Sequence, residues 1–245
     1  MPIFIVSLIV QLALIVHVLK TGRNTFWVFV LLFAPVIGGI AYFIVELLPE
    51  LTNSRSGRQA RRSVSKVINP NGDLKHASRQ FAVADTVQNS IVLANQFLER
   101  SQYAEAKDIL ERSRKGVHAD DPVILLLLAK SHFGLQDYAA VLRTLEELKT
   151  SNPSARSPEG HLLYARAQEE SGKLDEAIHE YEALAQYFPG PEPRCRLATL
   201  LKQKGDHERA RALFQEVVRE SEIAGRHYSS LHKEWVSLAR REAKG

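Results

Sequence analysis

The sequence predicts an all-α protein in which a two-helix transmembrane hairpin precedes an α-solenoid of repeated helix pairs with a C-terminal capping helix. Three observations lead to this prediction. Residues 1–50 contain two long apolar stretches, residues 85–223 repeat with a period of about 34 residues, and residues 224–245 carry one amphipathic stripe. Residues 51–84 join the first two regions as a basic, polar linker.

The composition excludes several classes of protein. The chain has 245 residues and a formal net charge of +4, which is too small to indicate a nucleic-acid partner. Its single cysteine, Cys195, excludes an intramolecular disulfide and a cysteine-rich zinc or iron–sulfur site. We interpret Cys195 as a small residue of a helical core or groove.

The apolar stretches at residues 3–19 and 25–48 are candidates for membrane-spanning helices. The first carries no formal charge and would rise about 25 Å as a helix, just enough for the hydrocarbon core of a bilayer. The second carries one acid, Glu46, and contains Pro35 and the pair Gly38–Gly39, which membrane helices tolerate. The short polar segment between them suits a tight turn between antiparallel helices.

Three other interpretations of this region stay open. A cleaved signal peptide is disfavoured, because the first stretch has no basic segment ahead of it and no small-x-small cleavage motif after it. A buried hairpin of a soluble protein is disfavoured by the length and unbroken apolarity of both stretches. Pro35 and the two glycines also allow the second stretch to be re-entrant rather than spanning.

The second stretch carries a recognisable series of residues, namely Trp27, Pro35, Gly38, Tyr42 and Glu46. In this it resembles the N-terminal membrane module that precedes the catalytic domains of bacterial phospholipase D-type cardiolipin synthases. The resemblance covers about residues 1–50 and implies a hairpin in a bacterial inner membrane. Phospholipase chemistry is excluded, because none of the nine histidines begins the H-x-K-x-x-x-x-D signature of that family.

Basic residues gather on the C-terminal side of the second stretch, and no acid occurs from Thr52 to Asn71. They are Arg55, Arg58, Arg61, Arg62 and Lys66. Because Lys and Arg favour the cytoplasmic side of a membrane, this bias predicts a cytoplasmic C-terminal region, although Lys20 and Arg23 in the hairpin loop oppose it. Membrane lipids are expected around the hairpin, and their anionic headgroups are candidate partners of the five basic side chains.

Small residues recur in register through the repeat region. One set is Ala106, Val141, Ala177 and Ala210, with spacings of 35, 36 and 33 residues, and the other set is Ala94, Ala129, Ala165 and Ala198. Small side chains let two helices approach closely, and large apolar residues between them fill the space between neighbouring pairs. Stacked pairs therefore bury a continuous core that one pair cannot supply.

The segment Pro158–Pro189, with Gly172 at its turn, closely resembles the tetratricopeptide repeat consensus. The first unit lacks the turn glycine and the closing proline, and the second has Gln136 at the turn and Val141 where alanine is usual. The resemblance therefore implies three to four repeats. Asp121–Pro122 and Ser157–Pro158 are typical helix starts, and Asp137 and Asp175 are predicted to cap second helices.

The repeat register ends after Ser221. The stripe beyond it consists of Tyr228, Leu231, Trp235 and Leu238. We expect this stripe to form a terminal helix that covers the open end of the stack, with a binding role for Trp235 as the alternative.

Catalytic motifs are absent from the sequence. There is no H-E-x-x-H, no Walker loop, no G-x-S-x-G and no glycine-rich dinucleotide fingerprint. The sequence therefore predicts neither an enzyme nor a bound metal or cofactor.

The resemblance to tetratricopeptide domains implies a partner-binding groove lined by first-helix residues. By register these are Asn95, Leu98, Leu126, Lys130, Phe133, Leu162, Arg166, Glu169, Thr199 and Lys202, with Cys195 beside them. Lys130, Arg166 and Lys202 would form a basic streak beside apolar side chains. Such a groove suits an extended or helical segment with acids and apolar anchors, while an ordinary solvated face is the alternative.

Together these features predict a membrane-anchored, non-enzymatic scaffold that binds protein or peptide partners at the cytoplasmic face of a bacterial inner membrane. Two alternatives are a scaffold that faces the periplasm and serves envelope assembly, and an accessory factor of a phospholipid-synthesising enzyme. The first differs only in topology, and the second depends on the resemblance of residues 1–50 alone.

Overall fold

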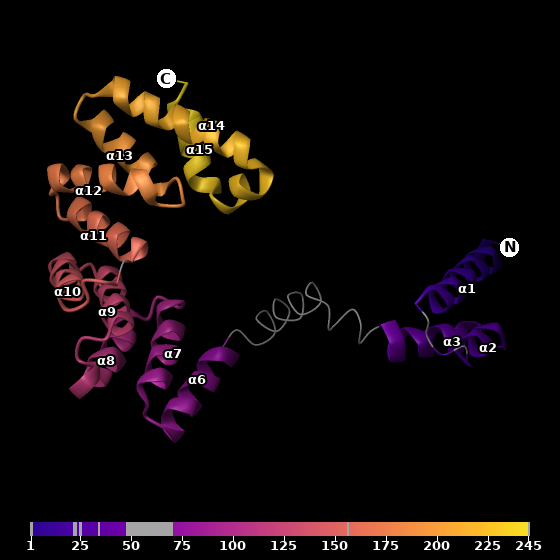
Figure 1. The fold of residues 1–245 in the computed structure, drawn as a ribbon. Helices are drawn as coiled ribbons and strands as arrows, with labels where there is room; N and C mark the ends of the chain where they lie inside the picture. Colours follow the sequence, from indigo (N-terminus) through magenta and orange to yellow (C-terminus); the bar gives the residue numbers. More distant parts are fainter. Residues whose placement is uncertain are drawn as a thin grey trace. The chain divides into compact units, whose positions relative to one another are not determined.

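The computed structural model describes residues 2–21, 24, 26–33, 35–47, 71–155 and 157–244, and the regular elements of these ranges are helices. The chain divides into an N-terminal unit, Met1–Gly72, and a C-terminal unit, Asp73–Gly245. Figure 1 shows the helices of both units in chain order.

The N-terminal unit contains the helices α1 (Pro2–Lys20), α2 (Phe26–Phe33) and α3 (Pro35–Tyr42), followed by a π-helical segment, η1 (Phe43–Leu47). The stretch expected to be one span at residues 25–48 is described as α2, α3 and η1, and Ala34 between α2 and α3 lies outside the described residues. A search of the described residues finds no helix that combines the length and apolarity needed to cross a bilayer.

The N-terminal unit pairs its polar groups internally. Val18, Leu31 and Tyr42 are fully buried where α1 packs on α2 and α3. The Tyr42 hydroxyl lies 3.0 Å from His17 Nδ1, and Trp27 Nε1 donates to Glu46 Oε1 at 3.1 Å. Large apolar side chains occupy the outer surface, with Phe33 81% and Ile37 76% exposed.

The five basic linker residues, Arg55, Arg58, Arg61, Arg62 and Lys66, lie outside the described residues. The region expected to be linker as far as residue 84 is partly helical, because α6 spans Gly72–Val83. Leu74, Ala77 and Phe81 recur at helical spacing and pack against Leu93 and Ile109. Helix α6 thus covers the first end of the repeat stack.

The repeats form four successive helix pairs in the C-terminal unit, as Figure 1 shows. The pairs are α7 (Val87–Leu98) with α8 (Tyr103–Ser113), α9 (Pro122–Gly134) with α10 (Tyr138–Ser151), α11 (Pro158–Glu170) with α12 (Leu174–Tyr187), and α13 (Glu192–Gln203) with α14 (His207–Leu231). A short 3₁₀ turn, η2 (Gly116–His118), joins α8 to α9.

The predicted small residues are buried where the helices meet. Ala94, Ala129, Ala165 and Ala198 of the first helices are 0% exposed, as are Ala106, Val141 and Ala177 of the second helices. Val141 fits because the contact needs a compact side chain rather than alanine itself. The solenoid interpretation is thereby confirmed for all four pairs.

Each pair turns through a left-handed residue at one register position. The φ angles are 57° at Ser101, 60° at Gln136, 74° at Gly172 and 87° at Gly205. In the second pair the N–H of Gln136 bonds Phe133 O and the N–H of Asp137 bonds His132 O, which is the Schellman pattern. The turn is therefore kept in the first two pairs without the glycine that favours it.

The helix caps follow the predictions with one exception. Asp121 accepts hydrogen bonds from the N–H groups of Val123 and Ile124, Ser157 accepts one from Gly160, and Asp137 accepts one from Ala140. The prediction for Asp175 is wrong. Lys173 occupies that N-cap position and makes no side-chain cap bond, while Asp175 pairs with Lys204 of the next repeat.

The C-terminal end differs in detail from one capping helix over residues 224–245. Helix α14 continues to Leu231 and bends at Gly225, whose φ of 83° and ψ of −169° are not helical. Helix α15 (Lys233–Glu242) then packs Trp235 and Leu238 onto the core that α13 shares with its neighbours. Because Trp235 covers that core, its burial favours the capping role over a free binding surface.

Replacing Gln136 by glycine should raise the free energy of unfolding of the full-length protein by about 1 kcal/mol, because a left-handed backbone strains any residue with a Cβ. Urea denaturation followed by circular dichroism in a mild detergent measures the change. The matched control, Gly172→Gln, should lose a similar amount. Equal or lower stability of Gln136→Gly would contradict the strain assigned to this turn.

Candidate functional site

The first-helix face contains a pocket of about 330 Å³ between the first two pairs. Asn95 of α7 and Leu126 and Lys130 of α9 line it, so the structure brings three of the predicted groove residues together. The remaining lining residues are Pro122, Val123, Leu127, Leu148, Ala155 and Ser157. Its wall is mainly apolar, with Asn95 and Lys130 as the polar groups of the predicted set.

Two of the predicted side chains are core rather than groove. Leu162 is 8% exposed and belongs to the cluster between the third and fourth pairs. Cys195 is fully buried in the same cluster, with its Sγ 3.6 Å from Trp235 O, and burial raises the pKa of its thiol to about 12. A neutral, enclosed thiol is unsuited to nucleophilic chemistry.

The predicted basic streak is paired with acids. Lys130 Nζ lies 2.8 Å from Glu159 Oε1, Arg166 Nε lies 3.8 Å from Glu192 Oε1, and Lys202 Nζ lies 2.7 Å from Glu242 Oε2. Glu159 and Glu192 belong to the first turn of the next first helix, and Glu242 belongs to α15.

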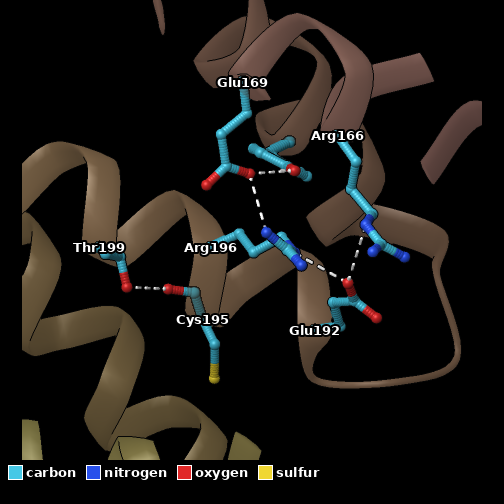
Figure 2. Close-up of polar contacts among 7 residues, drawn as sticks. Arg166, Glu169, Glu192, Cys195, Arg196 and Thr199 are labelled. Carbon is cyan, nitrogen blue, oxygen red and sulfur yellow. Dashed lines mark hydrogen bonds and ion pairs between the residues drawn. The ribbon is translucent and has the colours of Figure 1, made fainter. Parts of the chain in front are cut away.

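Arg196 joins the third and fourth pairs at the centre of this face. Figure 2 shows its guanidinium between Glu169 and Glu192, with contacts of 3.0 Å and 2.8 Å. The guanidinium also lies over the ring of Trp235, 5.2 Å from its centroid. Burial opposes the charge of Arg196, but the carboxylates of Glu192 and Glu169 outweigh burial and raise the pKa of the guanidinium.

Glu169 is held from two sides. The hydroxyl of buried Tyr181 donates to Glu169 Oε2 at 2.6 Å, and the same oxygen accepts from Arg196. Burial and then Glu169 raise the pKa of Tyr181, so the hydroxyl stays protonated and donates. Glu169, predicted as a groove residue, therefore has its accepting oxygen occupied by the protein itself.

The other predicted residues take individual places. The Arg166 guanidinium lies 4.6 Å from the ring centroid of Phe133, which covers that aromatic face. Asn95 Nδ2 donates to Ile91 O at 2.9 Å and Thr199 Oγ1 donates to Cys195 O at 2.9 Å, both within their own helices. Leu98 packs at the edge of the core of the first two pairs.

The face as a whole is balanced in charge. Glu159, Glu169, Glu192 and Glu242 neutralise Lys130, Arg166, Arg196 and Lys202 through the contacts given above. The sequence pattern singled out Glu169 but not the other three acids. Glu159 and Glu192 stand in the first turns of α11 and α13, where the helix dipole alone accounts for an acid, and Glu242 lies in α15, outside the repeats. Within the described part of the chain, no group of three or more His, Cys, Asp or Glu could hold a metal ion.

Comparisons with known proteins support the repeat assignment. Two tetratricopeptide repeat family models match, one at residues 159–191 and one at residues 191–222. The chain therefore contains tetratricopeptide repeats, and both matches lie outside residues 1–50. A search of curated proteins found no match.

Solved structures with this fold include MamA, with a TM-score of 0.55 and 13% identity over 70% of this chain and 96% of that chain. MamA of Desulfovibrio magneticus has a TM-score of 0.54 and 14% identity over 66% of this chain and 93% of that chain. A thermophilic tetratricopeptide protein of Thermus thermophilus has a TM-score of 0.52 and 16% identity over 70% of this chain and 87% of that chain. At these identities the likeness shows the fold alone, an all-α solenoid of tetratricopeptide type.

Replacing Arg196 by methionine should lower the free energy of unfolding by about 2–4 kcal/mol, because Glu169 and Glu192 lose their shared partner in a largely enclosed site. Urea denaturation of the full-length protein measures the loss. Arg209, an exposed residue that pairs with Glu182, gives the matched control Arg209→Met, for which we expect no measurable change. Equal effects of the two substitutions would contradict a special role for Arg196.

Proposed function

We propose that this protein is a membrane-bound tetratricopeptide adaptor that holds a partner protein on its first-helix face. The pocket lined by Asn95, Leu126 and Lys130 is the observation that supports this function most directly. It combines an apolar wall with a cation at one side, and its volume of about 330 Å³ suits one or two apolar side chains.

The partner that fits this pocket is an extended or helical segment with an apolar anchor and a neighbouring acid. Lys130 can exchange its present partner for such an acid at low cost. Glu159 is 64% exposed, and an exposed ion pair contributes only about 0–1 kcal/mol. The remainder of the first-helix face, between Arg166 and Lys202, holds the repeats together through its ion pairs.

The N-terminal unit is proposed to lie in the membrane. Among its described residues, twelve large apolar side chains are exposed, which exceeds what a soluble surface of this size usually presents. They are Leu12, Val16, Leu19, Phe26, Phe29, Leu32, Phe33, Ile37, Ile40, Phe43, Ile44 and Val45. Polar groups such as Tyr42 and Trp27 are instead paired within the unit, as lipid requires.

The proposed location of the repeats is the cytoplasmic face of a bacterial inner membrane. The support is the excess of arginine and lysine between residues 52 and 71 over the two basic residues of the hairpin loop. A cytoplasmic location places the first-helix pocket where it can recruit soluble proteins to the membrane.

Membrane binding predicts that the full-length protein sediments with membranes and stays there after washing with alkaline carbonate. The variant Phe29→Asp/Phe33→Asp/Ile37→Asp should be released, because charges are costly in hydrocarbon and these positions are exposed within the unit. The control Val83→Asp, at an exposed position of α6, should stay in the pellet. Wild-type protein in the carbonate supernatant would contradict the proposal.

Partner binding predicts that purification from gently solubilised membranes recovers a stoichiometric partner. Val123→Glu should reduce its recovery at least about tenfold, because it places a charge at the apolar wall of the pocket. The control Arg143→Glu changes an exposed position of α10 that does not line the pocket and should leave recovery unchanged. Recovery of the same partner with Val123→Glu, at unchanged helicity, would count against this binding face.

A further inference from the structure

A second, larger cavity of about 900 Å³ lies at the junction of the second and third pairs. Its walls come from α10, the segment between α10 and α11, the first half of α11, and α12. It shares Leu148, Ala155 and Ser157 with the smaller pocket, but its other lining residues differ. These are Leu145, Glu146, Lys149, Thr150, Asn152, Pro153, Pro158, Gly160, His161, Tyr164, Glu180 and Tyr187.

Three of these residues form a chain of hydrogen bonds along one wall. His161 Nε2 lies 2.5 Å from Glu180 Oε2, and His161 Nδ1 lies 2.5 Å from the Tyr187 hydroxyl. Because a carboxylate only accepts, Nε2 donates to Glu180, and Nδ1 shares a hydrogen bond with the Tyr187 hydroxyl, whose oxygen has two lone pairs. This arrangement leaves the Tyr187 oxygen free to accept a hydrogen bond from a ligand.

The same wall presents flat aromatic surface. The rings of His161 and Tyr187 stack with centroids 6.0 Å apart and an interplanar angle of 28°. Tyr164 follows His161 on α11 and lines the cavity as well, and the Tyr187 side chain is 52% exposed. The hydrogen bond to His161 holds Tyr187 in place, so its ring is a preorganised surface for stacking.

Among the described residues that line the cavity, carboxylates outnumber cationic side chains. Glu146 has no hydrogen bond or ion pair from its side chain to any described residue, and Glu180 keeps one oxygen beyond its contact with His161. Lys149 is the cation among the described lining residues, and it is exposed. Burial raises the pKa of Tyr164, and the nearby carboxylates of Glu146 and Glu180 raise it further.

We propose that this cavity binds an arginine side chain of a partner protein. A guanidinium is planar and stacks on tyrosine, and its fork of N–H groups matches a carboxylate such as that of Glu146. Lysine offers no plane to stack, and an acidic side chain would meet two like charges. The proposed ligand differs from that of the pocket beside Lys130, because the cation there favours an acidic side chain.

Nuclear magnetic resonance of the full-length protein in a non-ionic detergent tests the site directly. The tyrosine rings are carbon-13 labelled, and Tyr164→Phe and Tyr187→Phe assign their signals. The probe is the peptide acetyl-Ala-Leu-Arg-Leu-Ala-amide, and the matched control replaces arginine by citrulline, which keeps the shape and removes the charge. We expect the arginine peptide to shift the Tyr164 and Tyr187 signals and the citrulline peptide to bind at least about tenfold more weakly.

Substitutions separate the proposed contacts from general surface charge. Glu146→Gln, which breaks no contact within the described part of the protein, and Glu180→Gln should each weaken the arginine peptide about fivefold or more. Glu176→Gln, an exposed acid of α12 outside the cavity, should leave its affinity unchanged. Equal binding of the citrulline peptide, unchanged affinity of Glu146→Gln, or matching shifts with a glutamate peptide would overturn the proposal.

Discussion

The close approach of paired helices is the constraint on which the repeat unit depends. Each helix presents an apolar face, and a single pair leaves part of that surface exposed to water. The alanines at 94, 129, 165 and 198 have no side chain beyond Cβ and are fully buried, so the second helix packs directly on the first. Larger residues such as Leu128 and Tyr181 then fill the space towards the neighbouring pair. Covers at both ends, α6 and α15, complete the stack.

The electrostatic contacts of the first-helix face serve two purposes that differ in strength. Arg196, Glu169, Glu192 and Tyr181 are largely enclosed, and removing one member leaves a buried charge without a partner. The pair of Lys130 and Glu159 is exposed and weak, so it can open when a partner supplies another acid. The contacts of Arg196 are strong and hold the repeats together, whereas the contact of Lys130 can be exchanged. The proposed binding function therefore lies near Lys130, in the second pair.

Much of the repeat architecture follows from the sequence, because the contacts that define it recur at one spacing. The buried alanines and the caps at Asp121, Asp137 and Ser157 were predicted in this way. Contacts between repeats were harder to predict. Glu159 and Glu192 share one register position, but an acid in the first turn of a helix is expected from the helix dipole alone, and Glu242 lies in α15, outside the repeats. Leu162 and Cys195 were assigned to the groove because register alone does not reveal which side of a first helix faces the next repeat.

In the N-terminal region, too, the sequence pattern did not predict the local structure in full. Apolar length predicted one helix over residues 25–48, whereas the described part of this stretch consists of α2, α3 and the π-helical segment η1, which apolar length alone does not predict. In the linker, composition concealed the spacing of Leu74, Ala77 and Phe81, which makes α6 part of the repeat unit. The cavity beside His161 has no counterpart in the sequence pattern, because its residues come from α10, α11 and α12 and belong to no motif.

Site-specific photo-crosslinking in living cells tests the central claim, that the first-helix pocket holds a protein partner. A photoreactive phenylalanine analogue at Asn95, which lines the pocket, is compared with the same analogue at Ala139, an exposed position of α10. The account predicts one discrete adduct from position 95 and none from position 139. No adduct at position 95, or the same products from both positions, would contradict it.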